Sequence, residues 1–167
     1  GWGAQPVDPN LYTHKDRGFK HELPKTIILE HTVIDLGDSI KTLQYIQRTQ
    51  MDVHGFFKYS DIAFNLYIDT SGNEFEGRAK EIIPIVYPGK NLGNYVVGFI
   101  GRFDDHQDAR EVDKSMVIKW GKSLGKLAFD LEFGSLAINK NVFTICQLVK
   151  NANPRKKIFD NYPKILS

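Results

Sequence analysis

The segment "DIAFNLYIDTSGNEFEGR", residues 61–78, carries the clearest structural pattern in the chain. Its first half places an apolar residue at every second position, at Ile62, Phe64, Leu66 and Ile68. A period of two is typical of a β-strand. Thr70-Ser71-Gly72-Asn73 then supplies the residues that tight turns favour. The segment therefore predicts a β-hairpin whose second arm runs from Glu74 to Gly77.

Other segments predict the rest of a sheet. Thr26–Leu29 and Tyr95–Phe103 are short apolar runs of the kind found in sheet centres, and Asn141–Val149 predicts a last strand. An apolar stripe from Asp38 or Ser39 to about Met51 predicts one helix. Asp108 with Glu111 resembles a capping arrangement for a second helix that ends near Glu132, and Pro154 suits the first position of a third.

The order of these elements is β-α-β-β-β-α-β-α, which predicts an α/β fold with a mixed central sheet of about five strands flanked by three helices. The 167 residues, 41% of them hydrophobic, suit a single domain over residues 1–167. Within it, the proline-containing residues 1–25 form an irregular arm that packs on the rest. No linker, repeat or low-complexity tract interrupts the chain.

Composition excludes several function classes. The net charge of +2 and the absence of a basic stripe argue against nucleic acid as a partner. The single cysteine, Cys146, excludes an intramolecular disulfide and a zinc site built from several thiolates. No apolar run approaches the length of a membrane span and no signal peptide is present, so we expect membrane attachment only through an anchor outside this chain.

The first strand ends in Glu30-His31, an acid beside an imidazole. Because neighbours in a strand point to opposite faces, we expect one to face a cleft and the other to be hydrogen-bonded inside; a shared acid/base role is the alternative. Cys146 with His31 as base would be a nucleophile, but a lone cysteine in an apolar strand is more often a core residue. None of the five histidines is paired at metal-ligand spacing.

Six stretches together resemble the motifs of the peptidoglycan recognition proteins (PGRPs), relatives of zinc-dependent N-acetylmuramoyl-L-alanine amidases. They are "GWGAQP", "IILEHTV", "IQRTQM", "DIAFNLYIDTSGNEFEGR", "VVGFIGRF" and "NPRKKIFDNYP". The resemblance spans nearly the whole chain, and its most specific part is residues 61–78. It implies the mixed α/β fold of that family.

The resemblance also implies that the amidase chemistry is missing. The family's amidases bind zinc through two histidines and a cysteine, and those positions fall on Glu30, Ile145 and Asn153. Their tyrosine near the scissile amide falls on Phe64. A single carboxylate does not hold zinc, and without zinc no water is activated. We therefore expect no cofactor, no metal and no amidase activity.

The groove that binds muropeptides in this family is altered as well. The family's Gly-Trp after Glu-Gly-Arg is replaced by Ala79-Lys80, and its Gly-Ala-His-Thr falls on Pro84–Tyr87, which makes Ile85 and Val86 apolar groove residues. His31, Arg78 and Arg102 remain as possible ligand or interface contacts. Together with Phe64, these are the predicted site residues.

The resulting expectation is a non-catalytic domain of innate immune signalling. It would bind another PGRP-type immune receptor ectodomain and dampen it, as the membrane-anchored regulatory type among insect members implies, with weak or absent peptidoglycan binding. The expected location is extracellular, with secreted or cytoplasmic as alternatives. One alternative function is a muropeptide receptor using His31, Arg78 and Arg102; a less favoured one is an enzyme with Glu30 as general base.

Overall fold

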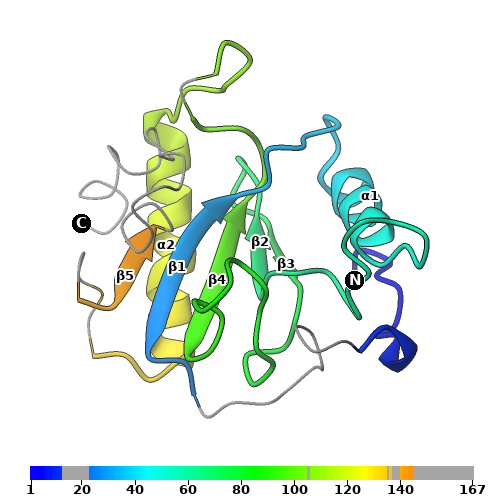
Figure 1. Cartoon of the computed structure of the whole chain (residues 1–167). Helices are drawn as coiled ribbons and strands as arrows, with labels where there is room; N and C mark the ends of the chain where they lie inside the picture. Colours follow the sequence, from blue (N-terminus) through cyan, green and yellow to red (C-terminus); the bar gives the residue numbers. More distant parts are fainter. Residues whose placement is uncertain (13–22, 105, 135, 137–139, 145–167) are drawn as a thin grey trace.

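The computed structural model describes residues 1–12, 23–104, 106–134, 136 and 140–144, and in them five strands form one sheet (Figure 1). The strands are β1 (Thr26–His31), β2 (Leu66–Ile68), β3 (Glu74–Glu76), β4 (Asn94–Phe99) and β5 (Val142–Thr144). Their order is β3-β2-β4-β1-β5, with β3 antiparallel to β2 and the other neighbours parallel. The helices are the 3₁₀ helix η1 (Pro9–Leu11), α1 (Ser39–Gln50) and α2 (Lys114–Asp130).

This arrangement confirms the predicted α/β class and the mixed five-stranded sheet. The predicted helix from Pro154 and the predicted strand beyond Thr144 lie outside the described residues. No helix among those described is both long and apolar enough to cross a bilayer.

The larger core lies between α2 and one face of the sheet. Trp120 of α2 is fully buried and stacks on Phe99 of β4, with ring centroids 4.0 Å apart. The same layer includes Ile27, Leu29, Val97, Val142, Met116, Leu124 and Leu127. Because side chains alternate along a strand, the odd-numbered residues of β1 and β4 face α2 and the even-numbered ones face away.

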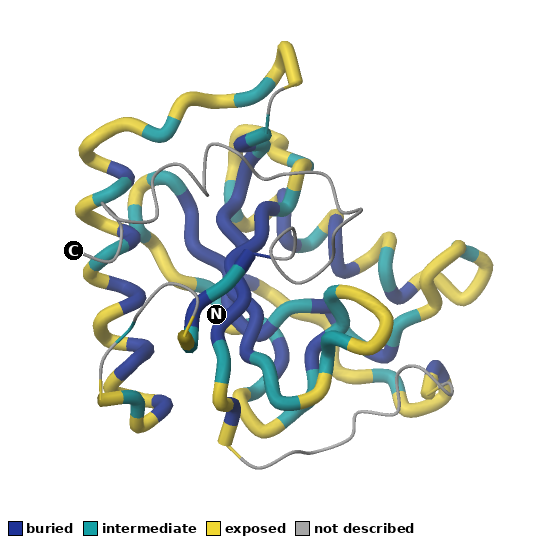
Figure 2. Tube along the Cα trace, turned by 60° about the vertical axis from the view of Figure 1, so that its left-hand side comes forward, coloured by how far each residue is buried: buried dark blue, intermediate teal, exposed yellow. Residues whose placement is uncertain are grey.

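A second, smaller core lies between α1 and the opposite face, near β2. Leu43 and Ile46 of α1 pack there with Tyr67, and Trp2 joins them from the N-terminal arm. Ile40, predicted to share this stripe, is 43% exposed. The central strands are buried along most of their length, as the dark tube in Figure 2 shows.

The hairpin of residues 61–78 is confirmed, but its first strand is shorter than predicted. The turn closes through Asp69 and Asn73, with Gly72 at φ 83°, a conformation that favours glycine. The strand itself begins only at Leu66, although the carbonyls of Asn65 and Phe64 still accept from Gly77 N and Arg78 N. The N–H groups of Ile62, Ala63 and Phe64 instead donate to the side chains of Asp61, Gln50 and Tyr67.

The Asp69 side chain joins the hairpin turn to α1. One carboxylate oxygen accepts from the backbone N–H groups of Ser71 and Asn73, each at 2.9 Å. The other accepts from the Ser39 hydroxyl at the start of α1 and from the Asn73 side chain. The Asp69 carbonyl also accepts from Trp120 Nε1 of α2, so one residue contacts both helices.

The start of α2 differs from the prediction. Asp113 caps the helix, accepting from Met116 N at 2.9 Å, and Lys114 is its first residue. Asp108 lies outside the helix, and its carboxylate is 3.5 Å from His106 Nδ1. Asp108 and Glu111 have capping-box spacing, but Asp113 is the acid whose oxygen reaches the free N–H of the first turn.

Replacing the Asp69 carboxylate should weaken the whole domain. Asp69→Ala leaves two turn N–H groups and the Ser39 hydroxyl without their acceptor, so we expect a loss of about 2–4 kcal/mol in the free energy of unfolding. Urea denaturation followed by tryptophan fluorescence measures this change. Ser71→Ala is the matched control, because it keeps the backbone N–H of the same turn, and it should cost less than about 0.5 kcal/mol. Equal losses in the two variants would contradict the role given to Asp69.

Candidate functional site

Glu30 and His31 at the end of β1 lie on opposite faces of the sheet, as predicted. Glu30 pairs in register with Gly98 of β4, on the face away from α2. His31 lies on the α2 face, where its Nδ1 accepts from Phe103 N at 3.0 Å. The two residues are 5% and 3% exposed, so the structure does not bring them to a common substrate position.

Phe64 covers the sheet beside Glu30. A Cβ atom built on Gly98 would lie 2.7 Å from Phe64 Cδ2, so the ring rests directly against the Gly98 backbone. The ring also stacks on Tyr67, with centroids 5.6 Å apart. Glu30 and Gly98 are cross-strand neighbours on this face, so Phe64 and Glu30 flank one position, called here the candidate groove.

Tyr67 holds Phe64 in place through a hydrogen bond and a ring contact. Its hydroxyl accepts from Phe64 N at 3.1 Å, and the side chain is almost completely buried. Burial raises the pKa of Tyr67 well above its usual range, and the hydrogen bond from Phe64 offsets only part of that shift. The phenol therefore stays neutral and works as a fixed acceptor for the backbone of Phe64.

Asn65 fixes the loop that follows β3. Its side-chain oxygen accepts from Val96 N of β4, and its Nδ2 donates to the carbonyls of Arg78, Ala79 and Ile82. Asn65 is fully buried, so these bonds satisfy an amide that would otherwise be costly to place there. The loop is thereby held against the sheet at the edge of the candidate groove.

Arg78 is part of the same framework. It is 3% exposed, and Nε donates to the Ile62 carbonyl at 2.9 Å. Its other nitrogens donate to the carbonyls of Ile83 and Asp61, each at 3.2 Å. The guanidinium thus links residues 61–62 to the loop after β3, whereas the predicted contact of Arg78 with a ligand stays a prediction.

Ile85 lies beside the segment that carries Phe64, and Val86 follows it in the same loop. Ile85 N donates to the Ala63 carbonyl at 2.9 Å, which places Ile85 next to the segment that carries Phe64. Val86 N donates to Asn91 Oδ1 at 2.8 Å. Both side chains are half-buried, so the rim at this point is apolar.

Ala79 and Lys80 line a different hollow. It has a volume of about 420 Å³, lies on the α2 side of β3, and is called here the Tyr95 pocket. Its remaining lining residues are Glu76, Arg78, Glu81, Tyr95, Leu127, Asp130 and Leu131. The structure therefore separates Ala79 and Lys80 from Phe64 and Ile85, with which they were grouped by sequence.

Arg102 pairs with a carboxylate of its own chain. Its Nε lies 2.9 and 3.2 Å from the two carboxylate oxygens of Asp104, and its side chain is 32% exposed. The hydrogen bond from Arg102 is the main cause that lowers the pKa of Asp104 to about 2, helped by the bond from His106 N. An external carboxylate would have to compete with Asp104 for this guanidinium.

No group of three or more metal-ligating side chains converges within the part of the chain that the structure describes. Ile145, Asn153 and Cys146 lie outside the described residues, so the predicted loss of the second and third zinc ligands stays a prediction. The described residues of the candidate groove offer one buried carboxylate and an apolar, aromatic surface.

Two residues that help to build these sites, Asn65 and Tyr95, were not predicted from the sequence. Asn65 gave a signal, since a polar amide inside an alternating apolar run needs buried partners. Tyr95 gave none, because a tyrosine at the start of an apolar strand does not differ from a core residue. Its position in the Tyr95 pocket depends on α2 and the loop after β3.

The solved structures that superpose on this chain are PGRP domains. The Drosophila protein PGRP-SD superposes with a TM-score of 0.72 at 19% identity, covering 96% of this chain and 88% of its own. The complex of the PGRP-LCa and PGRP-LCx ectodomains with tracheal cytotoxin gives 0.72 at 19% identity, covering 98% and 93%. Apis mellifera PGRP-SA gives 0.68 at 19% identity, covering 96% and 97%. No protein-family model and no curated protein sequence matches the chain.

Gly98→Ala should force Phe64 off the sheet. The new methyl group would lie 2.7 Å from Phe64 Cδ2 and 3.2 Å from Tyr67 Cδ1, so we expect a loss of about 1–3 kcal/mol in the free energy of unfolding. In a Phe64→Ala background the same substitution should cost at least about 1 kcal/mol less. Urea denaturation of the four proteins measures this coupling. Equal costs of Gly98→Ala in both backgrounds would show that Phe64 does not rest on Gly98.

The Arg102–Asp104 pair should stabilise the domain in a defined pH range. The folded pKa of Asp104, about 2, lies below its ordinary value of 3.8, so the contribution is complete above about pH 4 and is lost as the pH falls toward 2. Arg102→Ala should raise the pKa of Asp104 toward 3.8 and, since solvent screens the pair, cost about 0.5–1 kcal/mol at pH 7, less at pH 2. Carboxyl NMR titration and urea denaturation measure the two effects. Arg110→Ala, which removes the contact with Asp35, is the control and should leave the Asp104 titration unchanged.

Proposed function

We propose that this chain, which has the fold of PGRP domains, is a non-catalytic member of that group that acts through protein contact. In this proposal it binds a related PGRP-type receptor ectodomain and dampens immune signalling, with little or no peptidoglycan binding of its own. The proposed location is extracellular, in the ectodomain of a membrane-anchored protein. In this proposal the chain is of the regulatory insect type that its sequence resembles, such as PGRP-LF.

The observation that carries the proposal is the packing of Phe64 on Gly98 beside Glu30. By the resemblance, this is where the family's amidases have the tyrosine and the first histidine. Here the tyrosine hydroxyl is missing and the imidazole is replaced by a carboxylate that is 5% exposed. Neither change leaves a group that would polarise an amide.

The same geometry favours a protein partner over a muropeptide. Two of the residues expected to contact a muropeptide, His31 and Arg78, are each 3% exposed and bonded to backbone groups. Arg102 is bonded to Asp104. The apolar rim at Ile85 and Val86 offers few polar groups for a sugar or stem peptide, and apolar surface is better suited to protein contact.

Pairing between such domains has a structural precedent. The solved complex of the PGRP-LCa and PGRP-LCx ectodomains holds two domains of this fold with tracheal cytotoxin, and PGRP-LE has been solved with the same muropeptide. A domain of this fold that contacts a receptor ectodomain without contributing muropeptide binding would compete with a productive pair. This is the mechanism that we propose for dampening.

The test separates muropeptide binding from receptor binding. We expect calorimetric titration with tracheal cytotoxin to give no binding at micromolar concentrations, with PGRP-LE as the positive control. We expect the PGRP-LCx ectodomain to bind the immobilised chain in surface plasmon resonance with a dissociation constant in the micromolar range or tighter.

Opposite results would favour the alternatives. Micromolar binding of tracheal cytotoxin without receptor binding would identify a muropeptide receptor. Release of stem peptide from peptidoglycan, with and without added zinc, would identify an enzyme. Either outcome would overturn the proposal.

A further inference from the structure

In the described part of the chain, β3 is the last strand of the sheet and no strand pairs with its outer side. Asn65 pairs with Gly77 and Asp69 with Asn73 through backbone bonds of 2.9 and 3.0 Å, so residues 73, 75 and 77 face β2. In an antiparallel pair the alternate residues turn their peptide groups the other way. The N–H and C=O groups of Glu74 and Glu76 therefore point outward.

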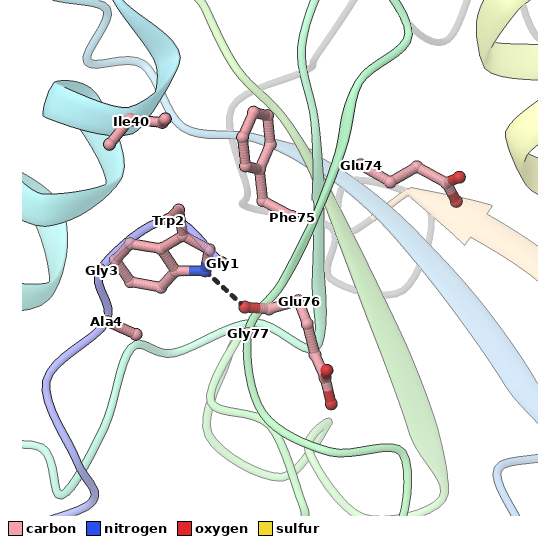
Figure 3. Close-up of a pocket in the computed structure, with 9 residues that line it drawn as sticks. All are labelled: Gly1, Trp2, Gly3, Ala4, Ile40, Glu74, Phe75, Glu76 and Gly77. Atoms are coloured by element: carbon pink, nitrogen blue, oxygen red, sulfur yellow. Dashed lines mark hydrogen bonds between the residues drawn. The ribbon is translucent and has the colours of Figure 1, made fainter.

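One of these outward groups is already occupied, which confirms their direction. Trp2 Nε1 of the N-terminal arm donates to the Glu76 carbonyl at 2.8 Å (Figure 3). The other three, the N–H and C=O of Glu74 and the N–H of Glu76, have no hydrogen-bond partner among the residues that the structure describes. This set is what an added strand uses, since each incoming residue donates one bond and accepts another.

The two faces of this edge offer different surroundings. On the α1 side lies a hollow of about 480 Å³, called here the Trp2 pocket, where Trp2, Ile40 and Phe75 provide apolar surface (Figure 3). On the α2 side lies the Tyr95 pocket of about 420 Å³. In Figure 3 the Phe75 ring turns toward Trp2 and Ile40, whereas the Glu74 and Glu76 carboxylates point away from them.

On the α2 side, carboxylates outnumber cations by one. Glu76, Glu81 and Asp130 line the Tyr95 pocket, and Glu74 lies on the same face of β3. The cations nearby are Lys80, which lines the pocket, Lys126, which is 3.6 Å from Glu74, and Arg78, whose guanidinium donates to backbone carbonyls.

The Tyr95 side chain lies close to the carboxylates of this pocket. Burial first, and then the charges of Glu76, Glu74 and Asp130, raise the pKa of its phenol. Tyr95 is 7% exposed, and its hydroxyl has no hydrogen-bond partner in the described part of the chain. A cationic side chain that enters the pocket would meet carboxylates and a neutral hydroxyl in one place.

We propose that the β3 edge binds an extended segment of a partner protein, as an added strand in which basic residues alternate with apolar ones. Successive side chains of a strand point to opposite faces. An apolar residue would therefore enter the Trp2 pocket while its basic neighbours reach the Tyr95 pocket. This surface is separate from the candidate groove, and the inference does not rest on the proposed function.

The probe is a seven-residue peptide of alternating lysine and valine, acetylated and amidated, added to the full chain labelled with ¹⁵N. We expect chemical-shift changes centred on residues 74–77 and 95, and affinity several-fold weaker at 300 mM than at 50 mM sodium chloride. A glutamate–valine peptide should bind at least tenfold more weakly. Equal binding of the two peptides, or shifts centred elsewhere, would overturn the proposal.

A matched pair of variants separates backbone pairing from charge. Glu74→Gln and Glu74→Pro both remove the carboxylate, but only proline removes the outward N–H, which β2 does not use. We expect the glutamine variant to bind the lysine–valine peptide about threefold more weakly than the wild type, and the proline variant at least tenfold more weakly. Asp130→Asn should also weaken binding, whereas Asp108→Asn, at an exposed carboxylate outside the edge, should not.

A second measurement avoids any loss of folding in the proline variant. Methylating alternate backbone nitrogens of the peptide removes its donors on one side, and one of the two possible methylation registers should abolish binding to the wild-type chain. Unchanged binding in both registers would overturn strand addition. Concentration-dependent shifts at residues 74–77 without peptide would show a second copy of the chain at the edge, and would overturn the assignment to a partner protein.

Discussion

The packing of the two helices on the sheet depends on the hydrogen bonds of Asp69. The Asp69 carboxylate accepts from the turn N–H groups of the hairpin and from the Ser39 hydroxyl at the start of α1. The backbone carbonyl of Asp69 accepts from the Trp120 indole of α2. Both helices are thereby held against the same hairpin, one on each face of the sheet. The large core around Trp120 and the small core around Tyr67 can then pack independently, because their common boundary is already set.

Side chains replace strand pairing where the candidate groove is built. Residues 62–64 donate their N–H groups to Asp61, Gln50 and Tyr67, and Asn65 and Arg78 bind the carbonyls of the neighbouring loop. Irregular backbone beside a buried sheet needs such partners, since unsatisfied peptide groups are costly there. The polar residues of this region thus serve the scaffold, and the surface that remains is apolar.

The sequence predicted the parts of the fold that depend on local patterns. The alternation and turn residues of 61–78 identified the hairpin, and the position of Glu30-His31 on one strand correctly separated their side chains. The start of α2 was wrong, because Asp108 and Asp113 are both acids ahead of the same helix and only the three-dimensional path decides which one caps it. The partners of Arg78 and Arg102 were also beyond a sequence pattern. An arginine's partner depends on which carbonyls or carboxylates the folded chain brings within about 3 Å.

The indole of Trp2 has a consequence for solubility. By covering the Glu76 carbonyl, it shortens the run of backbone groups that have no partner within the described part of the chain, on a sheet edge that also carries the like charges of Glu74 and Glu76. Edge groups of this kind are the template from which cross-β aggregates grow. The N-terminal arm thus covers part of an edge that lies more than seventy positions away from Trp2 in the sequence, so we expect loss of the arm to leave that edge more open to strand addition between copies.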